Sequence, residues 1–143
     1  MLDDYDAMRT QTLYSRILEH GGDRVVPMPE PHLDLLLDRA EYYPGRSLTL
    51  PGRPCHCHVN CSIEYMASPD IYRLATVYAL SKDELWRQHS WLVKRGNKII
   101  ETTSKRHAYF GVVLNELEAL MFVCGNVVSR LPGFDAHIAK AQM

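Results

Sequence analysis

The chain has 143 residues, of which 46% are hydrophobic and 23% are charged, and its formal net charge is −1. This size and composition fit one globular domain rather than a disordered chain. Lys and Arg are spread along the sequence, so we expect no nucleic-acid partner. No apolar run approaches the ~20 residues of a membrane span, so we expect no membrane partner. The acidic N-terminus differs from a secretory signal, so we expect a cytoplasmic protein.

The first third of the chain predicts helices. Residues 3–20 have helical apolar spacing, an aspartate that can cap the start, and Gly21 and Gly22 at the end. Residues 31–43 predict a second helix, and the turn-rich stretch 43–54 is expected to be irregular. We therefore expect a single domain over residues 1–143, with an N-terminal helical part over about residues 1–50.

A third helix is expected within residues 55–68. Val59, Ile63 and Met66 fall at helical spacing and predict its buried face, and Ser68 and Pro69 stop it. The segment begins with CHCHVNC, which holds three of the four cysteines of the chain.

The pattern then changes to that of β-structure. Residues 73–81, 86–94 and 97–103 are rich in β-branched and aromatic residues and predict strands, with a hairpin at Gly96 and Asn97. Residues 106–114 predict a strand or an extended loop. The cysteine helix and this antiparallel sheet make up about residues 51–114. A helical part follows over about 115–143, where Asn115 caps a helix, Gly125 follows its end, and the tail forms a loop and a short helix. The expected fold class is α+β, with helices packed on a small antiparallel sheet.

Cys57 is the candidate nucleophile. Near the first turn of a helix, free backbone N–H groups and the helix dipole favour a thiolate, which is the reactive form of cysteine. Cys55 is the second candidate, because it lies beside Pro54 in the loop before the helix. The ordinary alternative is that each cysteine is a small buried apolar residue.

His89 and Glu101 are the candidate partners of the cysteine. His89 lies on a predicted strand between two tryptophans, and its near-neutral pKa suits proton transfer to and from a thiol. Glu101 ends the next strand, where a buried carboxylate needs a partner such as a histidine N–H. In the ordinary alternative, both side chains face water and have no role.

A helix-borne cysteine followed by a hairpin with His on one strand and an acid on the next resembles the transglutaminase-like and papain-like cysteine enzymes. The matching stretches are His89-Ser90-Trp91 and Glu101-Thr102-Thr103. The segments CHVN, HSW, ETT and YFG also resemble small uncharacterised bacterial and phage proteins. The acid is Glu rather than Asp, no Pro follows it, and no Gln precedes the cysteine.

This resemblance implies a Cys57–His89–Glu101 triad with the cysteine at a helix N-terminus. The implied reaction is hydrolysis or acyl transfer at an amide or ester bond of a peptide, a protein or a small molecule. No cofactor is expected. The Cys57 N–H and a second donor, for which Gln88 is a candidate, would hold the oxyanion. The residues expected to shape the substrate site are His58, Asn60, Gln88, Trp91, Tyr109 and Phe110. Asn60 could also hold a loop by hydrogen bonds. Aromatic residues such as Tyr109 and Phe110 are more often simply core.

The triad sets a condition on the register of the hairpin. A two-residue loop would place His89 and Glu101 on opposite faces, because side chains alternate along a strand. A three-residue loop pairs Trp91 with Glu101 and makes His89 and Glu101 diagonal neighbours on one face. We therefore predict an odd-length turn, with Gly96 or Asn97 at positive φ, and a hydrogen bond from His89 to Glu101.

Two other classes of function compete with the enzyme. The first is a zinc-binding module, because Cys55, His56, Cys57, His58 and Cys61 are all of ligand type, although their spacing would require remote ligands such as His107 or Cys124. We expect no metal site. The second is a catalytically inactive interaction or inhibitor protein on the same fold, because a fold does not guarantee activity.

Overall fold

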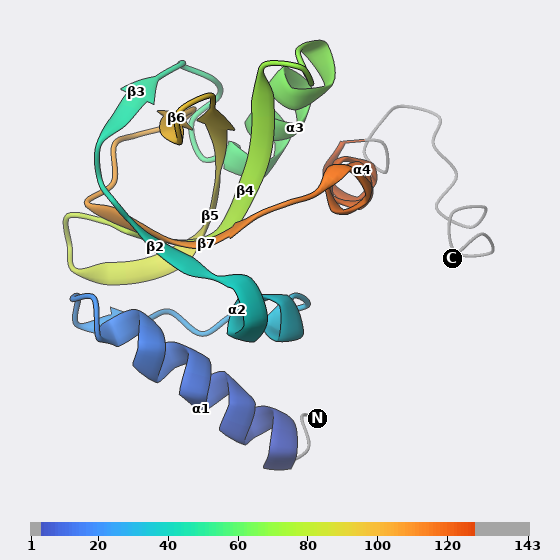
Figure 1. The fold of residues 1–143 in the computed structure, drawn as a ribbon. Coiled ribbons are helices and arrows are strands. Elements are labelled where there is room, and N and C mark those ends of the chain that lie inside the picture. The colour runs from blue at the N-terminus through green and yellow to red at the C-terminus, as the bar shows by residue number, and fades with distance from the viewer. Residues whose placement is uncertain (1–3, 128–143) are drawn as a thin grey trace.

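The computed structural model of the protein describes residues 4–127 (Figure 1). This range contains four helices, none of which is long and apolar enough to cross a membrane. They are α1 (Asp4–Leu18), α2 (Leu33–Arg39), α3 (Cys57–Ala67) and α4 (Glu116–Asn126). The strands are β1 (Arg24–Val25), β2 (Glu41–Pro44), β3 (Ser47–Thr49), β4 (Tyr72–Leu80), β5 (Leu85–Lys94), β6 (Lys98–Glu101) and β7 (Ala108–Val113).

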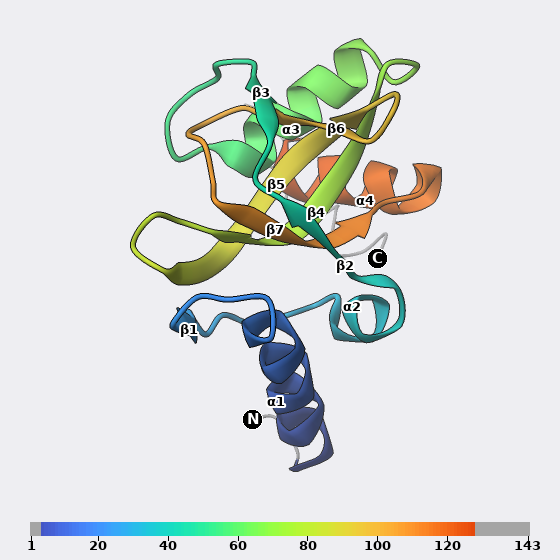
Figure 2. The same ribbon diagram turned by 60° about the vertical axis from the view of Figure 1, so that its left-hand side comes forward.

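All these strands belong to one curled sheet. Their order is β2-β7-β4-β5-β6-β3, and β1 pairs with β5. The pairings β2–β7, β4–β7, β4–β5 and β5–β6 are antiparallel, whereas β3–β6 and β1–β5 are parallel. Figures 1 and 2 show α1 and α2 at one side of the sheet and α3 and α4 at another. The structure is therefore α+β with a mostly antiparallel sheet, as expected, whereas a specifically papain-like or transglutaminase-like fold stays a prediction.

The two faces of the sheet build separate apolar clusters, because successive side chains of a strand point to opposite faces. The larger cluster joins the sheet to the helices and includes Leu13, Tyr78 and Phe110. The smaller cluster lies on the opposite face, inside the curl, and is formed by Ala75, Ala79, Trp91, Val93, Ile99 and Tyr109. The inner face is the one that matters for the candidate site.

The hairpin between β5 and β6 has the predicted register. Leu92 pairs with Ile100 and Lys94 with Lys98, which leaves a loop of residues 95–97. Gly96 and Asn97 have φ of 83° and 57°. This three-residue turn brings His89 and Glu101 to the same face of the sheet.

Two predictions for the first third of the chain are wrong. The helix expected over 31–43 ends at Arg39, and Tyr42 and Tyr43 pair instead with Phe110 and Tyr109 of β7. Cross-strand aromatic pairs stabilise a sheet, and here they override the helical pattern. The stretch 43–54, expected to be irregular, also contains β3, which pairs with β6.

The helix expected within residues 55–68 forms as α3 and begins at Cys57, but its buried face differs from the prediction. Ile63 and Met66 are 49% and 47% exposed, whereas Asn60, Cys61 and Ser62 are buried. Polar groups on this face find hydrogen-bond partners, which lets a polar helix face pack closely against the sheet.

The helix predicted after Asn115 is α4. Asn115 caps it through a capping box with Glu118, as expected. Gly125 does not follow its end, because the helix continues to Asn126. The expected tail loop and terminal helix lie outside the described residues.

Candidate active site

Cys57 is the first residue of α3 and is half-buried. The residue before it, His56, makes no side-chain cap. First-turn N–H groups of a helix have no partner within the helix, and the helix dipole adds positive potential at the same place. The sequence therefore positions the sulfur where a negative charge is favoured.

Asn60 fixes the loop that leads into α3. Its Oδ1 accepts from the Arg53 N–H at 3.2 Å, and its Nδ2 donates to the Arg53 carbonyl at 2.9 Å. A Cβ at Gly52 would lie 2.5 Å from Asn60 Cγ, so the loop backbone can approach this amide only where a side chain is missing. The predicted loop-holding role of Asn60 is confirmed.

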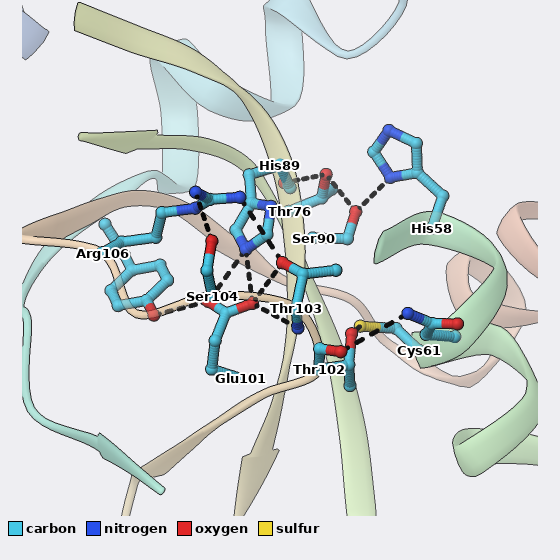
Figure 3. Close-up of polar contacts among 12 residues, drawn as sticks. His58, Cys61, Thr76, His89, Ser90, Glu101, Thr102, Thr103, Ser104 and Arg106 are labelled. Carbon is cyan, nitrogen blue, oxygen red and sulfur yellow. Dashed lines mark hydrogen bonds and ion pairs between the residues drawn. The ribbon is translucent and has the colours of Figure 1, made fainter. Parts of the chain in front are cut away.

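His89 and Glu101 form a buried pair inside the curl of the sheet (Figure 3). His89 Nε2 lies 2.9 Å from both Oε1 and Oε2 of Glu101. Glu101 is 0% exposed. An isolated buried carboxylate is very unfavourable, so the surrounding donors decide its charge state.

Three further donors bind the Glu101 carboxylate. The Tyr109 hydroxyl donates to Oε2 at 2.7 Å, and the backbone N–H and the hydroxyl of Thr103 donate to Oε1 at 3.1 and 3.0 Å. Burial raises the pKa of Glu101, but His89 and these donors outweigh it, so the pKa is lower than the ordinary value. Glu101 is therefore ionised at neutral pH and accepts the Nε2–H of His89.

Cys57 and His89 change each other's protonation. Burial raises the pKa of Cys57, but hydrogen bonds and charge interactions with His58 and His89 outweigh burial and lower the pKa to about 5. Burial lowers the pKa of His89, but Cys57 and Glu101 raise it above its ordinary value. The lowered pKa of Cys57 and the raised pKa of His89 favour a thiolate–imidazolium pair, and Nε2 of His89 is bound to Glu101.

His58 is oriented by a chain of hydroxyl groups on the other face of β5 (Figure 3). Thr76 Oγ1 donates to the His89 carbonyl at 3.1 Å, and Ser90 Oγ donates to Thr76 Oγ1 at 3.1 Å. Because the Ser90 proton is used in this way, Ser90 Oγ accepts from His58 Nδ1, at 2.6 Å. The orientation of the His58 ring is thus set by the β4–β5 pair that also carries His89.

The other cysteines of CHCHVNC differ from Cys57. Cys55 is exposed, with φ of 61°, in the loop before α3. Cys61 is buried against the Thr102 hydroxyl, and burial raises its pKa. A thiol that is hard to ionise is a poor nucleophile, which disfavours Cys61.

A pocket of about 290 Å³ opens beside the pair. It is lined by Cys55, Cys57, Ala79, Ser81, Arg87, Gln88, His89, Thr103 and Arg106. Cys57 and His89 therefore share one cavity, as a nucleophile and its proton donor must.

The residues expected to contact substrate are only partly brought to this pocket. Gln88 lines it, but its amide nitrogen donates to the Pro29 carbonyl at 3.0 Å. Trp91 and Tyr109 are fully buried inside the curl, where Tyr109 binds Glu101, and Phe110 lies in the cluster on the opposite face. His58 and Asn60 lie on α3 and do not line the pocket; they bind Ser90 and Arg53 instead.

Sequence reasoning missed Thr103 and Arg106. Thr103 follows Glu101 by two residues, and side chains at this spacing often form a local hydrogen bond. This spacing could have predicted the bond from the Thr103 hydroxyl to Glu101. Arg106 carries no local signal, because its place at the pocket depends on the turn between β6 and β7.

Within residues 4–127, no group of three or more His, Cys, Asp or Glu side chains is arranged to hold a metal ion. The residues of CHCHVNC have other partners. His56 Nδ1 bonds to the Pro54 carbonyl, His58 to Ser90 and Cys61 to Thr102.

Comparison of the chain with protein-family models, with curated proteins and with solved structures found no match.

Proposed function

We propose that the protein is a cysteine-nucleophile hydrolase or acyltransferase that acts on an amide or ester bond through Cys57, His89 and Glu101. The observation that carries this proposal is the buried His89–Glu101 pair next to Cys57, which begins α3 and shares a pocket with His89. Burying a histidine and a carboxylate is costly, and perturbed ionisable groups that share a cleft are typical of catalytic sites.

Acylation is the first step. The Cys57 thiolate attacks the carbonyl carbon, a C–S bond forms, and the carbonyl oxygen takes the negative charge. The Cys57 backbone N–H at the start of α3 is a donor for this oxyanion. Because Nε2 of His89 is bound to Glu101, the proton for the leaving amine or alkoxide comes from Nδ1. The C–N or C–O bond breaks and leaves a thioester and a neutral imidazole.

Deacylation reverses the proton transfer. Water, or an amine in a transferase, gives a proton to His89 as its oxygen or nitrogen attacks the thioester. The C–S bond breaks, and the Cys57 thiolate and the His89 imidazolium return. Glu101 stays ionised and stabilises the imidazolium in the starting and final states.

Acylation by a simple activated ester tests the proposal without knowledge of the substrate. The protein is mixed with p-nitrophenyl acetate at pH 6, quenched in acid, and mapped by peptide mass spectrometry. We expect one acetyl group on Cys57, which is lost in Cys57→Ala and retained in Cys55→Ala. No acetylation of Cys57, or equal acetylation of the exposed Cys124, would count against a catalytic thiol and favour an inactive interaction protein.

A further inference from the structure

The pocket beside Cys57 has an unbalanced charge. Its lining contains two arginines, Arg87 and Arg106, and no aspartate or glutamate. A cleft lined by charges of one sign concentrates ligands of the opposite sign. The Cys57 thiolate opposes this effect, and the His89 imidazolium is already paired with Glu101, so a carboxylate must be held by direct contact with an arginine rather than by the net charge of the site.

The two arginines differ in their partners. Arg87 is neutralised by Asp83, with its two guanidinium nitrogens 3.1 and 2.6 Å from the carboxylate oxygens. Arg106 instead donates to two hydroxyl groups, to Ser104 Oγ at 3.1 Å and to Thr103 Oγ1 at 3.4 Å (Figure 3). Within the described part of the chain, no salt bridge compensates Arg106.

The hydroxyl partners hold Arg106 at the pocket. Thr103 Oγ1 accepts from Arg106 and donates to Glu101 Oε1, so the guanidinium is joined to the buried pair through one side chain. Arg106 is half-buried. A positioned guanidinium that retains free N–H groups matches the fork of a carboxylate, which it binds with two parallel hydrogen bonds.

We propose that the pocket selects substrates that carry a carboxylate close to the scissile amide or ester bond, and that Arg106 is the specificity-determining residue. This inference rests on the proposed function, because it places the carboxylate next to the bond that Cys57 attacks. Arg87 contributes little, since Asp83 already occupies its guanidinium.

Two alkylating reagents that differ by one charge measure this selection. Iodoacetate carries a carboxylate and iodoacetamide is neutral, and both alkylate the Cys57 thiolate. We expect the ratio of the iodoacetate rate to the iodoacetamide rate to be at least about tenfold higher at Cys57 than at the exposed Cys124 of the same molecule. Arg106→Gln should remove most of this preference, and added salt should weaken it.

Lys105→Gln is the matched control, because it removes a neighbouring positive charge that does not line the pocket. It should leave the preference at Cys57 intact. Dividing by the iodoacetamide rate cancels any change in the thiolate itself. Equal ratios at Cys57 and Cys124, or an equal loss in the two variants, would overturn the inference.

A binding measurement separates this inference from the proposed function. Succinate is titrated into the Cys57→Ser protein, and the NMR signals of the Arg106 side chain and of the neighbouring Thr103 backbone amide are followed. Rapid iodoacetamide labelling of Cys57 without a succinate-dependent shift would refute carboxylate selection and leave the reactive thiol in place. Suppose instead that succinate shifts the Thr103 amide signal, that the Cys57→Ser, Arg106→Gln double variant loses this shift, and that Cys57 of the parent protein is inert. This result would support the carboxylate site and refute the acyl-transfer function.

Discussion

His89 Nε2 lies 2.9 Å from each carboxylate oxygen of Glu101, and neither residue is more than 2% exposed. The pair spans two neighbouring strands and depends on the three-residue turn at 95–97. Because Glu101 takes Nε2, only Nδ1 remains for exchange with Cys57 or a substrate. The register of one hairpin thus fixes which nitrogen can do chemistry.

Glu101→Gln should weaken both the fold and the site. A neutral amide cannot accept all the donors that converge on this carboxylate, and an unsatisfied buried group costs about 1–3 kcal/mol. The variant should unfold at lower denaturant concentration and alkylate more slowly at Cys57, because the imidazolium loses its counter-charge. Tyr109→Phe, which removes one donor, should have a smaller effect, and Tyr43→Phe, whose hydroxyl donates to Glu41, should have none on alkylation.

The stability lost in Glu101→Gln should depend on pH. Because the pKa of Glu101 is lowered on folding, its carboxylate stabilises the fold at pH values above 4.5, the ordinary pKa. This stabilisation is lost as the pH falls through the folded-state pKa. Because the pKa of His89 is raised on folding, its imidazolium stabilises the fold at pH values below 6.5, the ordinary pKa. This stabilisation is lost as the pH rises through the folded-state pKa. Urea unfolding at several pH values should therefore show the largest difference from the parent protein at about pH 5–6.5. A difference independent of pH would contradict an ion pair.

His58→Ala should make Cys57 harder to ionise, because His58 helps to lower the pKa of this thiol. Starting from a pKa of about 5, a rise of one unit reduces the thiolate fraction at pH 5 about fivefold. The iodoacetamide rate at pH 5 measures this change. His56→Ala is the matched control, since His56 also adjoins Cys57 but bonds to Pro54. Equal slowing in both variants would show that the effect comes from disturbing the loop.

Asn60→Ala should loosen the loop before α3. It removes the two hydrogen bonds to Arg53, each of which contributes about 0.5–1.5 kcal/mol. Hydrogen exchange should be faster at the Arg53 amide and unchanged in the β4–β5 pair. Asn126→Ala, which removes one bond at the end of α4, provides the control. Unchanged exchange at Arg53 would show that Asn60 does not hold the loop.

Chelation tests the zinc alternative. We expect the urea midpoint and the circular dichroism spectrum to stay the same after exhaustive treatment with EDTA, because His58 and Cys61 are held by Ser90 and Thr102. A structural zinc ion supplies folding free energy, so its removal would unfold a true zinc module. Stoichiometric zinc in the purified protein together with loss of structure in EDTA would favour the zinc module over the enzyme.

The parts of the site that follow local rules could be predicted from the sequence. The helical spacing of the residues after Cys57 placed it near a helix start, and side-chain alternation linked the turn length to the meeting of His89 and Glu101. Contacts between distant segments could not be predicted. Tyr109 was expected to line a substrate site, but it donates to Glu101, because β7 reaches the inner face only through the pairing order of the whole sheet.

The buried face of α3 shows the same limit. Apolar spacing favoured Ile63 and Met66, yet Asn60, Cys61 and Ser62 face the interior. Each of these polar groups is satisfied by a partner that lies on another turn, loop or strand, such as Arg53 for Asn60 and Thr102 for Cys61. Periodicity alone contains no information about such partners.

The pH dependence of Cys57 alkylation tests the central claim most directly. Iodoacetamide rates are measured for each cysteine from pH 4 to pH 9 by peptide mass spectrometry. The rate at Cys57 should be half-maximal near its pKa of about 5. At pH 6 a larger fraction of Cys57 is thiolate than of a free thiol with a pKa of about 8.5, but the thiolate of a low-pKa thiol is less nucleophilic. The two effects together should make the alkylation of Cys57 about tenfold faster than that of the free thiol. A midpoint near that of a free thiol, shared by Cys57 and Cys124, would contradict the activated thiolate and the enzyme built on it.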